Sequence, residues 1–260
     1  MIMMETCARQ YWYKSLRIKP KEKDRKMLLG NIRHLGFEHI LRTDHPAICD
    51  DRRLTNDETD AINAELAKFY DWWMNCGLTP AYLNGRPAIE MRMEALHPDD
   101  PSIILVTRLD LLAVDDENRH CLVDWKSGKT QATQCFVDHA DQLTFMQVIV
   151  DGHLQQAGLG QVDSLAIVET KPPSARLDAR VTMIPSPKRG ATQVQDLLDK
   201  TRVIAERIRN QEFFATSRYG FNSPCNMCEY QCLCENSKNT QGFNIPSGVI
   251  IPVGLFEEAS

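Results

Sequence analysis

Three polar side chains near the middle of the sequence have the types and spacing of a cation-binding site. Asp110 lies in the apolar run VTRLDLLAV, and Asp124 and Lys126 lie in the run HCLVDWK. Because residues two apart on a strand share a face, Asp124 and Lys126 should project together, and pairing of the two runs would bring Asp110 beside them. Buried carboxylates need a partner or a metal, and one lysine cannot neutralise two. The set predicts a site for a hard divalent cation and a polarised water, or else a simple Asp–Lys pair on a solvated hairpin.

The two runs flank the polar turn DDEN, which is typical of a β-hairpin. Apolar periodicity and chain breakers predict further elements around this hairpin. Thr55 and Glu58 form a capping-box pattern at the start of one helix. The helices are expected at about residues 5–16, 22–41, 55–77, 134–151 and 192–210, and the strands at about 89–93, 164–169 and 179–184. This order predicts an α/β or α+β domain with a small mixed sheet flanked by helices.

The length and composition are those of a globular protein with one full core. At 260 residues, with 43% hydrophobic and 25% charged residues, a single domain over residues 1–260 is expected. Its parts would be a helical region to about residue 85, a core at 86–210, a cysteine region at 221–236 and a tail at 237–260. No apolar run approaches the roughly 18 residues of a membrane span, and the N-terminus has no secretion signal. The net charge of −5 does not indicate a nucleic-acid binder, although residues 14–26 hold seven basic and two acidic residues.

The cysteines indicate metal chemistry in a reducing compartment. Nine cysteines in a chain without an export signal argue for the cytosol and against a disulfide framework. The spacing Cys225-x2-Cys228-x5-Cys234 suits a metal or cluster, and Cys7 is the outlying candidate for a fourth ligand. An iron–sulfur cluster that joins the two ends of the chain is favoured, while a zinc site that uses Cys232 and ordinary free thiols are the alternatives. The remaining cysteines are expected to be buried small residues: Cys49, Cys76, Cys121 and Cys135.

Other motifs surround these residues in a fixed order along the chain. Cys7 is followed by aromatic and basic residues in TCARQYWYKSL, Gly30 and His34 form a Gly-x3-His pair, and Gln142 begins a helix. With Asp110, the Asp-x-Lys strand and the cysteine tail, the sequence resembles the RecB-like branch of the PD-(D/E)XK nucleases over nearly its whole length. It more closely resembles the iron–sulfur members typified by the AddB nuclease domain and the CRISPR adaptation nucleases. The chain departs from their pattern at two positions, with Thr107 where Gly is usual and Met146 where Tyr is often found.

The resemblance implies metal-dependent hydrolysis of DNA phosphodiesters on a restriction-endonuclease-like core. Asp110, Asp124 and the backbone carbonyl of Trp125 would bind Mg²⁺ or Mn²⁺, and a metal-bound water would be the nucleophile. Lys126 would orient that water and stabilise charge on the phosphate. Gln142 would hydrogen-bond to the phosphate or to the metal waters.

Two further residues are candidate ligands of this metal. His34 adds an imidazole, which suits Mn²⁺ better than Mg²⁺, while the alternative for it is a core histidine on a helix face. Glu90 is favoured over Glu94 as a further carboxylate. The resemblance also implies a structural 4Fe–4S cluster on four cysteines: Cys7, Cys225, Cys228 and Cys234.

The implied function is that of a DNA exonuclease acting on single strands or ends in a prokaryotic or phage-infected cell. Recombination, repair, phage DNA metabolism and CRISPR adaptation are the expected settings. The chain has no Gly-x4-Gly-Lys-Ser/Thr phosphate loop, so a helicase, recombination or CRISPR integration partner would be a separate polypeptide. The alternatives are a non-catalytic nucleic-acid-binding subunit with the same fold, or a zinc-stapled interaction protein. The basic residues expected to line the DNA path are Lys14, Arg17, Lys19, Lys129, Lys188 and Arg189.

Overall fold

The chain divides into two compact units in the computed structural model, which describes residues 7–21, 25–127, 131–215, 225, 228–252 and 254. The first, which we call the sheet unit, is Leu29–Leu198. The second, the cysteine unit, joins Met1–Leu28 to Asp199–Ser260. The single-domain organisation expected from the sequence stays a prediction.

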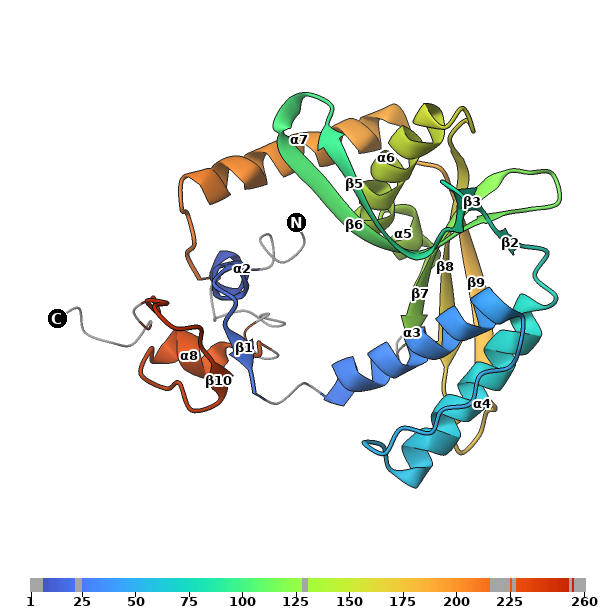
Figure 1. The fold of residues 1–260 in the computed structure, drawn as a ribbon, viewed down its shortest axis with the longest axis horizontal. Helices are drawn as coiled ribbons and strands as arrows, with labels where there is room; N and C mark the ends of the chain where they lie inside the picture. Colours follow the sequence, from blue (N-terminus) through green and yellow to red (C-terminus); the bar gives the residue numbers. More distant parts are fainter. Residues whose placement is uncertain are drawn as a thin grey trace. The chain divides into compact units, whose positions relative to one another are not determined.

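The sheet unit is built on a six-stranded mixed sheet in the order β2-β6-β7-β8-β9, with β5 paired to β6 (Figure 1). The β7–β8 pair is parallel and the other pairs are antiparallel. A mixed sheet flanked by helices was expected and is confirmed. The strands are β2 (Thr79–Pro80), β5 (Ile89–His97), β6 (Asp100–Val114), β7 (His120–Ser127), β8 (Val162–Lys171) and β9 (Arg180–Pro187), and a separate small pair is β3 (Tyr82–Leu83) with β4 (Arg86–Pro87).

The predicted hairpin is formed by β6 and β7, and its turn sets the register. Asp115 Oδ1 accepts the backbone N–H groups of Glu117 and Arg119, each at 2.9 Å, and Asn118 adopts a left-handed φ of 58°. Asn tolerates this conformation better than most residues. The resulting register pairs Leu112 with Leu122 and continues towards the end of the ladder where the candidate residues lie.

Helices cover both faces of the sheet (Figure 1). The helices of the unit are α3 (Arg25–Thr43, from Leu29 onward), α4 (Asn56–Trp73), α5 (Gln134–Asp138), α6 (Asp141–Gln156) and the first part of α7 (Ala191–Arg209). Trp125 on β7 packs against Phe37 of α3 and Phe69 of α4, at ring-centroid distances of 6.3 and 5.3 Å. Gly36 allows this layer to form, because a Cβ there would lie 2.4 Å from a methyl carbon of Leu66 on α4. Since side chains alternate along a strand, Asp124 and Lys126 face the opposite layer, which contains α6.

The helix predicted at residues 134–151 is two helices, so that prediction was wrong. Helix α5 ends at Asp138, and α6 begins at Asp141 after Ala140 takes an extended conformation with ψ 109°. The break is stabilised by buried Arg189, whose guanidinium donates to the Val137 carbonyl, to Ser186 Oγ at 2.8 Å and to Thr144 Oγ1 at 3.2 Å. A tertiary hydrogen bond therefore satisfies a carbonyl that would otherwise continue the helix.

The cysteine unit has a small aromatic core that brings together the two ends of the chain. Its elements are α2 (Ala8–Ser15), β1 (Lys19–Pro20), the last part of α7, α8 (Gln231–Glu235) and β10 (Phe243–Asn244), with β1 and β10 paired. Tyr230 stacks on Tyr13 at 5.3 Å and on Phe243 at 5.9 Å, and its hydroxyl donates to the Ile18 carbonyl at 2.9 Å. These contacts hold the segments together through apolar burial and hydrogen bonds.

No helix in the part of the chain that the structure describes has the length and apolar character needed to cross a membrane.

Replacing buried Arg189 and its exposed neighbour Lys188 in turn tests which of the two side chains stabilises the α5–α6 break. We expect Arg189→Ala to lower the free energy of unfolding by about 2–4 kcal/mol, because several buried hydrogen bonds to a charged donor are removed. Lys188→Ala, the matched control on an exposed side chain, should change it by less than about 0.5 kcal/mol. Urea denaturation of both variants measures the difference, and equal effects would contradict this account of the α5–α6 break.

Candidate active site

Two carboxylates from the central hairpin meet at the end of the β6–β7 ladder. The register places Leu111 opposite Val123, so the next pair along the strands is Asp110 with Asp124. Directly opposed residues of antiparallel strands point to the same face, with their Cβ atoms about 4.5–5.5 Å apart. Asp110 Oδ2 also accepts the Trp125 N–H at 2.8 Å, which ties one strand to the other at this point. Both aspartates are buried.

Asp124, Lys126 and Gln142 form a closed triangle of contacts between β7 and α6. Lys126 Nζ lies 2.7 Å from Asp124 Oδ2 and donates to Gln142 Oε1 at 2.9 Å, while Gln142 Nε2 donates to Asp124 Oδ1 at 2.6 Å. Asp124 Oδ2 is buried, and among the described residues it forms this ion pair with the Lys126 ammonium. Gln142 therefore fixes the positions of both the lysine and the carboxylate.

Glu90 adds a third carboxylate from the neighbouring strand β5. It lies between Ile89 and Met91, which pair with residues on either side of Asp110 on β6. Its Oε1 is 3.0 Å from His34 Nδ1, and its Oε2 forms an ion pair with Arg108, whose Nε lies at 2.9 Å. Glu90 has a left-handed φ of 49°, a conformation that is costly without glycine and that concentrates at functional sites.

The described residues fit a divalent cation. His34, Glu90 and Asp110 each offer a ligand atom, and these atoms all lie within 4.8 Å of one another. Asp124 lies outside this group of three, and its buried Oδ2 is 2.7 Å from Lys126 Nζ. Carboxylate oxygens are the ligands preferred by Mg²⁺ and Mn²⁺, and an imidazole shifts the preference towards Mn²⁺.

The electrostatics of the site reflect an excess of buried negative charge. Burial, followed by the neighbouring charge of Asp124, raises the pKa of Asp110 to about 7 against the opposing effect of His34. Burial likewise raises the pKa of Asp124, which the charge of Lys126 opposes. The hydrogen bond to Glu90 raises the pKa of His34 in spite of its burial. Without a metal, protons on these groups relieve the repulsion that a divalent cation would also relieve.

Arg108 is a site residue that sequence reasoning missed. It lies two residues before Asp110, so the alternation of strand side chains already placed it on the same face. Its side chain is 66% exposed, and it reaches Glu90 through one guanidinium nitrogen. The remaining N–H groups are available to an anion at the mouth of the site.

The other predicted residues have mixed outcomes. Arg189 was expected to line a DNA path and is buried instead, so that prediction was wrong for the reason given above. Lys129 lies outside the described residues. The role of the Trp125 carbonyl stays a prediction. Glu94 is exposed and pairs with Arg92, whereas Glu90 lies beside His34.

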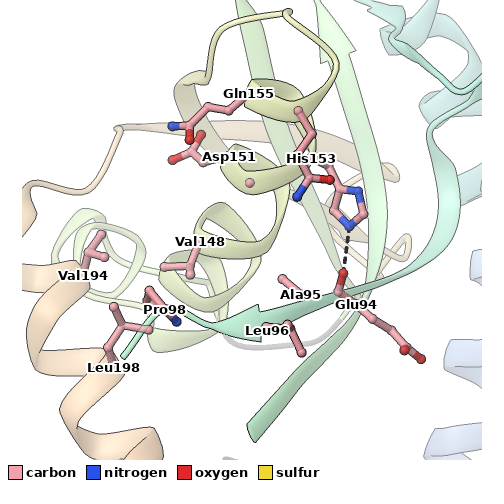
Figure 2. Close-up of a pocket in the computed structure, with 12 residues that line it drawn as sticks. Glu94, Ala95, Leu96, Pro98, Val148, Asp151, His153, Gln155, Val194 and Leu198 are labelled. Atoms are coloured by element: carbon pink, nitrogen blue, oxygen red, sulfur yellow. Dashed lines mark hydrogen bonds between the residues drawn. The ribbon is translucent and has the colours of Figure 1, made fainter. Parts of the chain in front are cut away.

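A cavity of about 530 Å³ lies elsewhere in the sheet unit, and its lining includes Glu94 but none of the residues of the carboxylate cluster (Figure 2). It is lined by β5, α6 and α7. The His153 ring donates to the Glu94 carbonyl at 2.9 Å, and Asp151 accepts the Val162 N–H at 2.7 Å. The polar groups that line this cavity are therefore used in holding the elements together, and the candidate site is the open cluster at the hairpin end.

The four cysteines predicted as cluster ligands line one small cavity within the cysteine unit: Cys7, Cys225, Cys228 and Cys234. Among these described residues, no three sulfur atoms lie within 4.8 Å of one another. Cys232 is exposed and does not line the cavity. Of the cysteines expected to be buried, Cys49 and Cys121 are buried and Cys76 is half-buried, but Cys135 on α5 is exposed, so the prediction for it was wrong.

The excess of buried negative charge predicts that Asp110→Asn stabilises the metal-free protein. Because the folded pKa of Asp110 is about 7, against a usual value near 3.8, the folded protein keeps a proton there that the unfolded chain has released. The free energy of unfolding should therefore fall as pH rises through that interval, and the raised pKa of His34 acts in the same direction. Asp110→Asn should abolish most of this fall and raise the Tm above about pH 7 in EDTA, by about 2–4 °C per kcal/mol recovered.

The control for this measurement is Asp116→Asn, at an exposed position in the hairpin turn, which should leave the pH profile unchanged. Thermal unfolding across pH, with and without Mn²⁺, gives the comparison. A wild-type Tm that does not depend on pH in this interval would refute the charge excess.

Comparison with known proteins gave a family match. A model of the PD-(D/E)XK nuclease superfamily matches residues 3–235. The solved structure described as "Crystal structure of SSO0001" is similar at 15% identity and a TM-score of 0.43, over 89% of this chain and 82% of that chain, a likeness too low to support an argument. The comparison with curated proteins gave no match. Because the family model spans most of its length, the chain belongs to the PD-(D/E)XK nuclease superfamily.

Proposed function

We propose that this protein is a divalent-metal-dependent DNA exonuclease of the RecB-like, iron–sulfur type. Membership of a nuclease superfamily makes hydrolysis of nucleic acid the general expectation. The observation that carries the specific proposal is the convergence of Asp110, Glu90 and His34 within ligand distance of one another, beside the Asp124–Lys126 pair. A non-catalytic subunit would have no need to keep these charges buried together at a cost in stability.

The residues divide into those that hold a metal and those that hold the substrate. Asp110, Asp124, Glu90 and His34 would bind Mg²⁺ or Mn²⁺, which when bound supplies a Lewis acid and lowers the pKa of a water ligand. Lys126 has three N–H donors, and its contacts with Asp124 and Gln142 direct two of them. The third is available to the attacking water or to a phosphate oxygen, where it stabilises the charge that develops during hydrolysis.

Arg108 and Gln142 support this arrangement from either side. Arg108 neutralises part of the charge of Glu90 and keeps other N–H groups for a substrate phosphate. Gln142 holds the side chains of Asp124 and Lys126 in one geometry, so that little reorganisation is needed when substrate arrives. A Gln142 variant should therefore lose activity through displacement of its two neighbours.

The biological setting belongs to the same proposal. An enzyme of this type acts on single strands or free ends in recombination, repair, phage DNA metabolism or CRISPR adaptation. A helicase, recombination or CRISPR integration protein would be its partner in such a setting. The rival proposal, a nucleic-acid-binding subunit without activity, makes the opposite forecast for every assay below.

Substitutions at the triangle should abolish hydrolysis without unfolding the protein. We expect Asp124→Asn and Lys126→Ala to lower kcat on end-labelled single-stranded DNA by about 10²–10³-fold with Mn²⁺, because each removes a group that stabilises the transition state. Gln142→Ala should cause a smaller loss. Lys68→Ala, on an exposed side chain of α4, is the matched control and should retain full activity.

Linear and circular substrates distinguish the mode of cleavage in the same assay. Release of short products from linear DNA, with circular DNA left intact, is the expected exonuclease pattern. An inactive wild-type protein with Mg²⁺, Mn²⁺ and every substrate would refute the enzyme proposal.

The second part of the proposal is a structural iron–sulfur cluster in the cysteine unit. The cavity lined by Cys7, Cys225, Cys228 and Cys234 has the four thiols that a 4Fe–4S cluster requires. The aromatic stack beside it already joins both chain segments, so the cluster would reinforce an existing contact.

Two cysteines four residues apart provide a matched test of the cluster. We expect Cys228→Ser to lose iron, the brown colour and several degrees of Tm after anaerobic purification, because Cys228 is one of the four cavity thiols. Cys232→Ser, at an exposed cysteine outside the cavity, should keep all three. Stoichiometric zinc with no visible absorption would contradict the cluster and favour the zinc-stapled alternative.

A further inference from the structure

The turn after α2 contains an arginine in a conformation that normally selects glycine. Helix α2 ends at Ser15 with Leu16 as its C-cap, and Arg17 follows with a left-handed φ of 59°. The Arg17 N–H bonds to the Lys14 carbonyl at 2.9 Å and the Ile18 N–H to the Tyr13 carbonyl at 3.1 Å. This is the Schellman arrangement, in which glycine usually occupies the left-handed position because it has no Cβ to clash. The backbone gains nothing from arginine here, but Gln211 adopts the same conformation after α7, so a role for the Arg17 side chain rests on its surroundings.

The side chain of Arg17 opens onto a cavity of about 350 Å³ within the cysteine unit, which we call the basic cavity. Lys14 and Lys19 also line it, and all three cations are exposed. Lys14 pairs with Glu229 at 3.0 Å, the one carboxylate among the lining residues. Within the described part of the chain, the side chains of Arg17 and Lys19 have no ion-pair or hydrogen-bond partner.

The floor of the basic cavity is apolar. Ile18 and Tyr230 are buried beneath it, and Met27, with 51% of its surface exposed, lies at its edge. A single-stranded nucleic acid has a charged backbone and flat apolar bases. Its phosphates would pair with the unpaired cations, and its bases would cover the apolar floor. A small inorganic anion would use the cations and leave the apolar surface without a partner.

The distribution of charge along the chain supports a polyanion at this surface. The cysteine unit has 14 basic and 10 acidic residues, whereas the sheet unit has 16 basic and 25 acidic residues. The sheet unit therefore repels a phosphate backbone except where bound metal neutralises it. A substrate that is to be held before hydrolysis needs a cationic surface, and the cysteine unit is the part of the chain that has one.

We propose that the basic cavity binds the phosphodiester backbone of single-stranded DNA, with Arg17 kept in a glycine-type position for this purpose. The inference rests on the proposed function for the identity of the polyanion. Lys19 and Lys14 contact neighbouring phosphates, and the surface around Met27 receives a base. The cavity is a docking surface built from residues of the cysteine unit, and its contribution is to affinity.

The variant Arg17→Gly distinguishes a DNA-binding role of the arginine from a purely structural role, because the two roles predict opposite results. If Arg17 serves only the fold, glycine should be neutral or better and DNA binding should not change. We expect the Tm to stay the same or rise, while affinity for a labelled single-stranded DNA oligonucleotide falls by roughly threefold or more at moderate salt. The slope of log K against log salt should become shallower by about 0.7 for each phosphate that the variant no longer neutralises. Fluorescence anisotropy in EDTA, on holoprotein that contains Asp124→Asn, measures binding without cleavage.

The chain offers a matched control in the same unit. Gln211 follows α7 with a left-handed φ of 57°, and its N–H and that of Glu212 make the same pair of Schellman hydrogen bonds, at 3.1 and 2.9 Å. Gln211→Gly should therefore stabilise the protein as Arg17→Gly does, with no change in DNA affinity. Arg17→Lys should keep most of the binding, and Lys19→Ala should lower it independently of any strain.

Each outcome decides the inference. Reduced DNA affinity in Arg17→Gly and Lys19→Ala, but not in Gln211→Gly, supports it, and this result stands even if the wild-type protein proves inactive as a nuclease. Unchanged affinity in both basic variants, or no DNA binding by the parent protein in EDTA, overturns it while leaving the proposed hydrolysis intact. Binding to vesicles of anionic lipid with none to DNA also overturns it and assigns the surface to membranes.

Discussion

The structure of the candidate site depends on the burial of neighbouring carboxylates at the end of one β-hairpin. Asp110, Asp124 and Glu90 come from three adjacent strands, and like charges this close repel one another in a medium of low dielectric constant. The protein offsets part of this repulsion with Lys126, His34 and the Trp125 N–H. Burial, together with the remaining repulsion, raises the pKa values of the aspartates, with that of Asp110 near 7. A site with this imbalance is suited to a divalent cation, which restores neutrality more fully than a proton can.

Side chains packed on the two faces of the sheet keep these carboxylates buried and close together. On one side, Trp125 is held against Phe37 and Phe69, so the strand cannot rotate to release Asp124 to solvent. On the other side, α6 presents Gln142, and the first turn of α6 is set by the α5–α6 break around Arg189. Buried polar groups far from the metal ligands thus determine whether the lysine and the aspartate meet in the right geometry.

Six of the described non-glycine residues have a left-handed φ, and two of them lie beside clusters of charged side chains. Glu90 lies in the carboxylate cluster, and Arg17 lies over the basic cavity. Non-glycine residues in this region cost about 1–2 kcal/mol each. Glu90 gains two charged partners in return, while Arg17 gains none within the described residues, which is why its role is assigned to a ligand.

The sequence alone was sufficient for the features that depend on local order. Alternation within VTRLDLLAV and HCLVDWK, with a polar turn between them, determined the hairpin and the common face of Asp124 and Lys126, because strand side chains repeat every two residues. The capping box at Thr55 was equally local and is present. The tertiary structure decided the rest. The position of Glu90 depends on the register between β5 and β6. The helix break after Asp138 depends on a hydrogen bond from Arg189. The exposure of Arg17 depends on packing between the two ends of the chain. These contacts join residues far apart in sequence, so the residue pattern within a single segment does not predict them.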